Sequence, residues 1–208
     1  TFDYTIQQGD KSASATVSLT IMPVNDEPSF NNLLSTYSVP ENQKSVTTIL
    51  GQDVDGDEFT ISLAGVDEQS FNLSGSNVLS FKQAPDFEVK ERYAIEVVIA
   101  DSEETVSQNV NVSVININDN NPIFSSTGEF SAAENQTAIG TVTATDADKD
   151  NVTFSISSSE LSITSAGVLT FVSAPDYETR SSYKVNVTVT DGVNETTQLV
   201  TVNITDEN

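Results

Sequence analysis

The chain contains no cysteine and no histidine in its 208 residues. Disulfide bonds therefore cannot stabilise it, although the missing cysteine says nothing direct about its redox compartment. A cysteine nucleophile and a histidine general acid or base are also absent. Any catalysis would have to use other groups.

Basic residues are scarce: 8 Lys and Arg stand against 31 Asp and Glu, a net charge of −23. Binding to a phosphate backbone requires Lys and Arg, so nucleic acid is a poor partner. Low aromatic content with strong negative charge is also typical of disorder, but regular apolar alternation argues against a disordered chain. No apolar run approaches the roughly 20 residues of a membrane span.

Apolar and polar residues alternate at period two, as in half-buried β-strands. The longest such runs, 93–99 and 183–189, are each followed by a second run, which predicts two hairpins. The second runs lie at 110–114 and 199–204, and shorter β-rich segments precede the hairpins at 45–50, 59–63, 71–73 and 78–81 and at 139–144, 152–156, 161–163 and 168–171. Helical periodicity is nowhere convincing. The pattern predicts an all-β chain of seven-stranded Greek-key β-sandwiches.

One pattern of acidic and amide residues occurs twice in the same order. Equivalent positions are 93 residues apart for Glu41 and Glu134, and 87 apart for Asp119 and Asp206. A repeat of this length is a whole domain. The first copy comprises Pro40-Glu41-Asn42, Asp53-Val54-Asp55, Asp86-Phe87-Glu88, Asp101 and Asn116-Ile117-Asn118-Asp119-Asn120-Asn121-Pro122; the second comprises Ala133-Glu134-Asn135, Asp146-Ala147-Asp148, Asp176-Tyr177-Glu178, Asp191 and Asn203-Ile204-Thr205-Asp206-Glu207-Asn208.

The repeat divides the chain into two complete domains, 28–121 and 122–208, with a fragment at 1–27. The fragment has only one hairpin's worth of strand and resembles the last two strands of a preceding repeat, so we expect the chain to be an excised piece. Two strands alone are marginally stable in water. We therefore expect the fragment to be held by neighbouring molecules, exchanged between chains or poorly ordered.

These motifs closely resemble those of the cadherin repeat, because all five occur in order, twice, at matching intervals. The resemblance covers residues 28–208, with a tail end at 1–27. The sequence segments 24–28, 84–88 and 174–178 resemble those of cadherin-like modules in large bacterial surface proteins more than those of vertebrate cell-junction cadherins. The resemblance implies cadherin/immunoglobulin-like sandwiches joined end to end, located outside the cell, where calcium is plentiful.

Calcium takes six to eight oxygen ligands from carboxylates, amides and backbone carbonyls. The resemblance implies a junction between the two repeats that holds about three Ca²⁺ ions. Its ligands would be Glu41, Asp86 and Glu88 from the first repeat, Asn118, Asp119 and Asn120 from the linker, and Asp146, Asp148 and Asp191 from the second repeat. Asn116 departs from the pattern, since the cadherin linker usually has Asp there.

The resemblance also implies partial metal sites at both ends of the chain. Their ligands would be Asp53, Asp55 and Asp101 upstream, and Glu134, Asp176, Glu178 and Asp206 downstream. The alternative, that these acids are only solvated loop charges, is left open. An EF-hand explains the loops poorly: 53–57 and 146–150 match its first three ligand positions, but Glu58 or Asn151 replaces its glycine, and its final glutamate is missing.

The predicted function is that of a calcium-rigidified segment of a long secreted or surface adhesin. Its partners would be the neighbouring repeats of the same chain. The alternative is direct recognition of a surface glycan or of an identical chain. The chain has no Trp, which excludes the tryptophan-anchored strand exchange of junction cadherins. Paired carboxylates can hydrolyse glycosides, but metal binding accounts for these pairs, so we expect no enzyme.

Overall fold

A computed structural model describes residues 1–22 and 24–207 of the chain. The chain divides into two compact units, of which the second comprises Ser38–Lys44, Gln83–Tyr93 and Val112–Asn208. All residues predicted for the central junction therefore belong to this one unit. Asn208, the last residue of the second motif, lies outside the described residues.

The described chain is built from β-strands, with one short 3₁₀ turn. Two strands, β1 (Phe2–Gln8) and β2 (Lys11–Val17), form the leading hairpin. The first repeat contains β3 (Ser29–Phe30), β4 (Thr36–Pro40), β5 (Ser45–Thr48), β6 (Gly51–Gln52), β7 (Thr60–Ala64), η1 (Glu68–Ser70), β8 (Phe71–Leu73), β9 (Val78–Phe81), β10 (Arg92–Ala100) and β11 (Thr105–Ile115). The second contains β12 (Ile123–Phe124), β13 (Glu129–Ala133), β14 (Ala138–Thr141), β15 (Ala144–Thr145), β16 (Thr153–Ile156), β17 (Leu161–Ile163), β18 (Val168–Phe171), β19 (Ser182–Thr190) and β20 (Glu195–Thr205).

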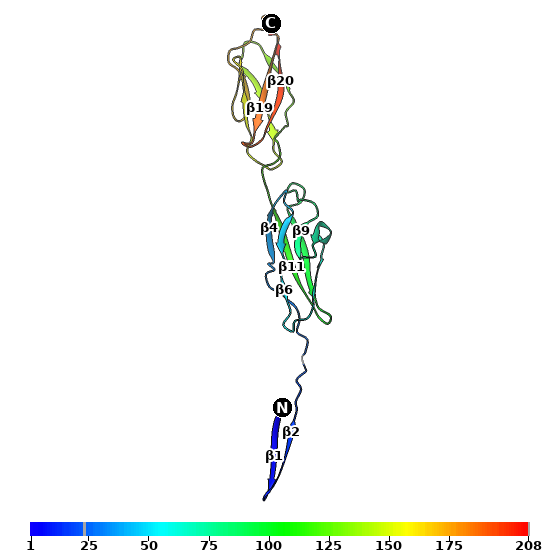
Figure 1. Ribbon diagram of the computed structural model, residues 1–208. Helices are drawn as coiled ribbons and strands as arrows, with labels where there is room; N and C mark the ends of the chain where they lie inside the picture. The colour runs from blue at the N-terminus through cyan, green and yellow to red at the C-terminus, as the bar shows by residue number, and fades with distance from the viewer. Residues whose placement is uncertain (23, 208) are drawn as a thin grey trace. The chain divides into compact units, whose positions relative to one another are not determined.

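Both repeats have the same sheet topology. The first has a four-stranded sheet in the order β4-β11-β10-β7 and a three-stranded sheet in the order β5-β9-β8, and the second has the orders β13-β20-β19-β16 and β14-β18-β17. Figure 1 shows the strands of each repeat as a separate β-domain. Each repeat also contains a small two-stranded sheet whose strands are two residues long: β3 with β6 in the first repeat and β12 with β15 in the second. The all-β prediction of tandem sandwiches is confirmed. Strands β13 and β20 are parallel, which places the residues after both strands at the same end of the sandwich.

The core of the second sandwich follows from strict alternation along its long hairpin. In β19, Val185, Val187 and Val189 are buried, and β20 contributes Val200 and Val202. The residues between them are exposed or half-buried. Each buried valine contributes about 1.5 kcal/mol or more to folding. This packing holds the strand ends that carry the acidic residues.

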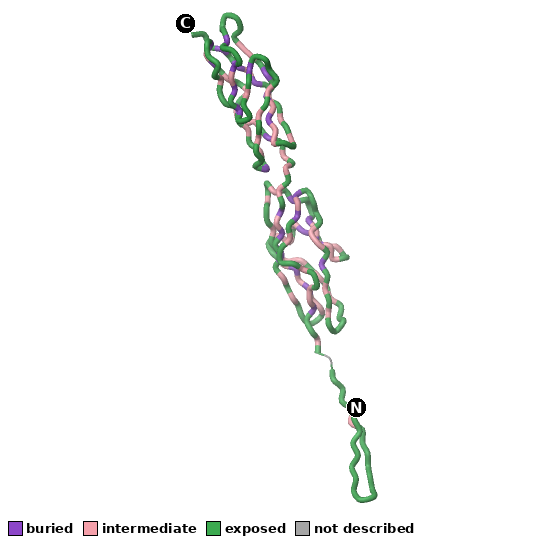
Figure 2. Tube along the Cα trace, turned by 90° about the vertical axis from the view of Figure 1, so that its left-hand side faces the viewer, coloured by how far each residue is buried: buried purple, intermediate pink, exposed green. Residues whose placement is uncertain are grey.

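The leading segment forms a hairpin, as the sequence predicted, but its second strand lies at Lys11–Val17 and not at the expected 15–21, and the hairpin is almost entirely exposed. Its register runs from Phe2 opposite Val17 to Gln8 opposite Lys11. Phe2, Tyr4 and Ile6 are all exposed, and Figure 2 shows the hairpin exposed along nearly its whole length. Its origin as the end of a preceding repeat stays a prediction. Among the described residues, no helix has the length and hydropathy needed to span a membrane.

Candidate metal centre

Glu41 directly follows β4 and is a buried carboxylate, with 1% of its surface exposed. A buried charge costs several kcal/mol unless it is hydrogen-bonded. Glu41 meets this requirement through two backbone donors: the amide of Phe87 donates to Oε2 at 2.9 Å, and the amide of Ile117 donates to Oε1 at 2.7 Å. Glu41 therefore joins the 86–88 turn to the start of the linker.

The second repeat reproduces this arrangement at Glu134, which is 7% exposed. Its Oε2 accepts from the amide of Tyr177 at 3.1 Å and its Oε1 from the amide of Glu207 at 3.0 Å. The next residues, Asn42 and Asn135, both adopt left-handed backbone conformations, with φ of 64° and 61°. Asparagine tolerates this region better than most residues. The motif that recurs in sequence therefore recurs in geometry.

Asp148 attaches the linker to the second repeat and is 5% exposed. Its Oδ2 accepts from the amides of Asp119 at 3.1 Å and Asn120 at 2.9 Å, and its Oδ1 accepts from the Asn120 side chain at 3.1 Å. Burial opposes ionisation, but these hydrogen bonds outweigh it and lower the pKa of Asp148. Asp148 is therefore a fixed, ionised group.

Asn194 adds a contact that the motifs did not predict. Its side-chain nitrogen donates to Asn118 Oδ1 at 2.7 Å and to the Asn120 carbonyl at 3.2 Å. Asp191, three residues earlier, accepts from the amides of Val193 at 2.7 Å and Asn194 at 2.6 Å. Burial works against ionisation here too, yet these bonds lower the pKa of Asp191. The only sequence signal for Asn194 was its position in the hairpin loop after Asp191.

Four carboxylates from four separate loops converge on this region. Oxygens of Glu41, Glu88, Asp119 and Asp148 all lie within 4.8 Å of one another. Two ligands of one Ca²⁺, each about 2.3 to 2.6 Å from the ion, can be at most about 5 Å apart, so a single ion could contact all four. Partial desolvation, together with the charges of Glu41 and Asp148, raises the pKa of Glu88.

Asp148 also belongs to a second group, whose other members are Asp146 and Asp150. Asp146 Oδ2 and Asn116 Oδ1 are buried and accept no hydrogen bond, and the Asn116 side chain donates to the Asp148 carbonyl at 2.9 Å. Oxygens without a donor suit a cation, and carboxylate and amide ligands select hard ions such as Ca²⁺ or Mg²⁺. The residues present therefore fit a divalent cation.

Two predicted ligands of the central junction, Asp86 and Asp191, belong to none of the acidic groups found among the described residues. Asp86 Oδ1 instead accepts from the amide of Val89 at 3.1 Å, and its carbonyl accepts from the amide of Lys90 at 2.9 Å. Asp86 therefore shapes the turn that presents Glu88. Its role as a ligand stays a prediction.

The upstream partial site repeats the linker contacts of the central junction. The amide of Asp26 donates to Asp55 Oδ2 at 2.8 Å, as Asp119 does to Asp148, and the Asn25 side chain donates to Asp101 at 3.2 Å. Backbone hydrogen bonds at the 101–104 turn lower the pKa of Asp101. The acids within ligand distance of one another are Asp53, Asp55 and Asp57, without Asp101.

The downstream partial site brings together Glu134, Asp176 and Glu178, again within 4.8 Å. Hydrogen bonds from the hydroxyl and amide of Thr179 lower the pKa of Asp176. Asp206 is exposed and belongs to none of the acidic groups found in residues 1–22 and 24–207.

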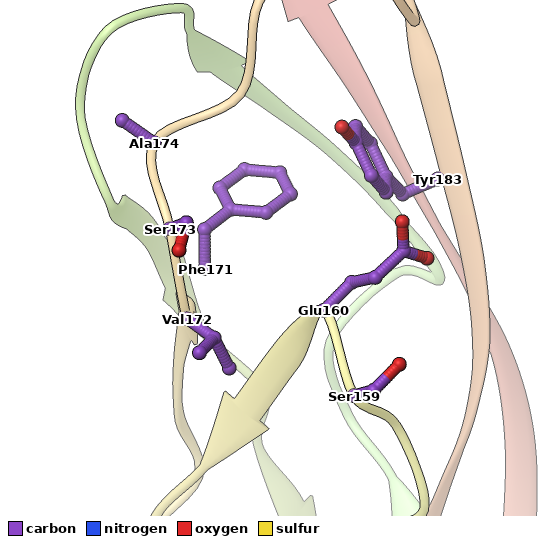
Figure 3. A pocket seen from close by; sticks show the side chains of 7 residues that line it. All are labelled: Ser159, Glu160, Phe171, Val172, Ser173, Ala174 and Tyr183. Atoms are coloured by element: carbon purple, nitrogen blue, oxygen red, sulfur yellow. The ribbon is translucent and has the colours of Figure 1, made fainter.

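A pocket of about 220 Å³ in the second sandwich offers an alternative site. Phe171 and Tyr183 line it together with Glu160 (Figure 3). Arg180 donates to both oxygens of Glu160, at 2.8 and 2.9 Å, and lies 4.1 Å from the centre of the Tyr183 ring. The pocket is smaller than typical ligand sites of about 300 Å³ or more, and its charged groups already pair with each other. These contacts support a structural role.

Comparisons with known proteins agree with this architecture. Residues 128–205 match the family model of the cadherin domain, and residues 25–113 match a model described as a bacterial Ig domain. Human Cadherin-23 is 30% identical over 81% of this chain, and human Protocadherin Fat 4 is 30% identical over all of it. The chain spans only 6% and 5% of those two proteins. A bacterial source stays a prediction.

Solved structures show the same fold. Human protocadherin-24 EC1-2 has a TM-score of 0.74 at 18% identity, covering 89% of this chain and 100% of that one. Mouse cadherin-23 EC22-24 has a TM-score of 0.72 at 20% identity, covering 86% of this chain and 67% of that one. The two repeats share their sheet topology and the position of their acidic residues, and both resemble known cadherins. The chain is therefore built from tandem cadherin-like repeats.

Proposed function

We propose that this chain is a calcium-binding segment of an extracellular adhesion protein, in which Ca²⁺ at the junction between residues 28–121 and 122–208 makes the linker rigid. The observation that carries the proposal is the convergence of Glu41, Glu88, Asp119 and Asp148 within 4.8 Å. These four acids come from the tip of the first repeat, the linker and the second repeat.

Electrostatic repulsion explains why the linker would respond to calcium. Two carboxylates 4 Å apart repel by about 1 kcal/mol in water, and by more where they are partly desolvated. Desolvation raises the pKa of Glu88, and the charges of Glu41 and Asp148 add to this rise. A bound cation would offset this negative charge and would be coordinated by several of the carboxylates at once. The linker hydrogen bonds to Asp148 then hold the second repeat to the same cluster.

The family resemblance supports about three Ca²⁺ ions at this junction, and the two acidic groups that share Asp148 are compatible with more than one ion. The cadherin relatives support a location outside the cell, on its surface or secreted. Neighbouring repeats of the same protein are the proposed partners. Direct recognition of glycans or of identical chains stays a prediction from the sequence.

Small-angle X-ray scattering in calcium and in chelator tests the proposal. We expect a narrow distribution of maximum dimensions in calcium and a broad one in chelator, because only the metal-bound linker would be restricted. Scattering profiles that do not change on chelation would refute the stiffening mechanism. Circular dichroism under both conditions would establish that the sandwiches themselves remain folded.

A further inference from the structure

The Asn194 side chain connects the loop between β19 and β20 to the linker. Its nitrogen lies 2.7 Å from Asn118 Oδ1 and 3.2 Å from the carbonyl oxygen of Asn120. A backbone carbonyl can only accept a hydrogen bond, so Asn194 must present its NH₂ group to Asn120. The same NH₂ group then requires an acceptor from Asn118. The two contacts therefore fix the orientation of both amide side chains.

The loop around Asn194 does not need this side chain for its own shape. The Asn194 amide donates to Asp191 Oδ1 at 2.6 Å, and the Asn194 carbonyl accepts from the Asp191 amide at 3.3 Å. The first repeat forms the same two bonds between Glu104 and Asp101, at 2.6 and 3.1 Å. The ionised side chain of Glu104 has no hydrogen to donate. The same turn therefore forms with a side chain that could not make the contacts of Asn194.

A second loop of the same repeat also holds the linker. Asp148 accepts from the amides of Asp119 and Asn120, and its carbonyl accepts from the Asn116 side chain at 2.9 Å. Together with Asn194, these bonds attach residues 116–120 to the second repeat at two separate loops. All of them are hydrogen bonds between protein groups, so they do not need a metal ion.

We propose that Asn194 is a positioning residue that keeps the linker attached to the second repeat in the absence of calcium. Its two hydrogen bonds restrict Asn118 and Asn120 before any ion arrives. Less conformational freedom is then lost when calcium binds, because the linker is already ordered. Attachment without metal does not depend on the proposed calcium function. The gain in calcium affinity rests on it.

Amide hydrogen exchange in chelator, followed by NMR on the full chain, tests the attachment. The reporters are the amides of Asp119 and Asn120, which are the linker donors. We expect Asn194→Ala to speed their exchange about two- to tenfold, the factor that corresponds to one net hydrogen bond. Glu104→Ala, the matched control at the equivalent turn, should leave it unchanged. The amide of Val187, a buried core residue, should exchange at the parent rate in both variants, because the sandwich stays folded.

Asn194→Asp separates the donated hydrogen bonds from the shape of the side chain. It keeps nearly the same size and the backbone bonds of the loop, but it places a carboxylate against the oxygens of Asn118 and Asn120. Exchange should therefore be at least as fast as in Asn194→Ala. Parent-like exchange in Asn194→Asp would mean that only the shape of the side chain matters and would overturn the inference. Equal acceleration in Glu104→Ala would overturn it as well.

Isothermal titration with Ca²⁺ distinguishes this inference from the proposed function. Asn194→Ala should weaken calcium binding by about two- to tenfold, because the linker must be ordered when the ion binds. A parent chain that binds no calcium overturns the proposed function, while the exchange experiment in chelator still decides the attachment. Faster exchange with unchanged calcium affinity overturns the preorganisation of the site. Unchanged exchange in a chain that binds calcium overturns only the role of Asn194.

Discussion

Replacing Glu41 with alanine should destabilise the protein even without metal. The substitution leaves the amides of Phe87 and Ile117 without their acceptor. Each unsatisfied buried donor costs about 1 to 3 kcal/mol. Because these two amides are only partly buried, we expect their combined cost to be in the lower part of the range, about 2 to 4 kcal/mol. Removing the charge also relieves repulsion from Glu88, by about 1 kcal/mol. The net loss in chelator should therefore be about 1 to 3 kcal/mol.

Urea unfolding in chelator and in calcium measures this loss, with Glu88→Ala as the control. Glu88 belongs to the same acidic group but is exposed and has a raised pKa. Its removal should be neutral or stabilising in chelator and destabilising in calcium. Glu41→Ala should be destabilising in both conditions, and more so in calcium. If Glu41→Ala costs no more than Glu88→Ala in chelator, the hydrogen-bonding argument is wrong.

Two further predictions concern the ion and the pH. Calcium should raise the unfolding temperature strongly and magnesium weakly, because magnesium demands a small octahedral site and retains its water; equal melting curves in calcium and chelator would contradict calcium binding. Because the folded pKa of Glu88 is raised, its ionisation in chelator reduces stability at neutral pH, and this cost disappears as the pH falls through that pKa. Glu88→Gln should therefore be more stable than the parent in chelator at pH 7, and an advantage that is equal at acidic and neutral pH would contradict the assignment.

Period-two alternation predicted the long hairpins well, because buried residues on β19 and β20 are separated by polar ones. The same signal did not reveal β4 or β13, which are five residues long and contain few apolar side chains. The two-residue pairs, such as β3 with β6, also have no periodic signal. These short strands are defined by pairing with distant segments, which a local pattern does not contain.

For the candidate site, composition and order indicated which segments meet but not which side chains face each other. The structure brings together Glu41, Glu88, Asp119 and Asp148, four of the residues expected at the junction, and their role as ligands stays a prediction. The turn-forming role of Asp86 and the contacts of Asn194 depend on hydrogen-bond geometry, which the sequence motifs do not encode.

The most direct test of the account compares Asp119→Ala with Asp206→Ala. Sequence spacing pairs the two residues, but the structure does not: Glu41 accepts from the amide of Ile117 and Glu134 from the amide of Glu207, so Asp206 corresponds in position to Asn116. Only Asp119 lies in the acidic group of the linker, while Asp206 is exposed and belongs to none of the acidic groups among the described residues. Because the chain has no cysteine, spin labels can be attached at single cysteines introduced at the exposed positions Asn72 and Asn186.

The distance between the two labels is measured across a calcium titration. Calcium should narrow the distance distribution in the parent and in Asp206→Ala, whereas Asp119→Ala should remain broad or require much more calcium. Asp119→Ala removes one carboxylate of the group formed with Glu41, Glu88 and Asp148. This loss should weaken the connection that a bound ion makes between the first repeat, the linker and the second repeat. A narrow, calcium-saturated distribution in Asp119→Ala, or equal broadening in Asp206→Ala, would contradict the claim that calcium acts through this linker.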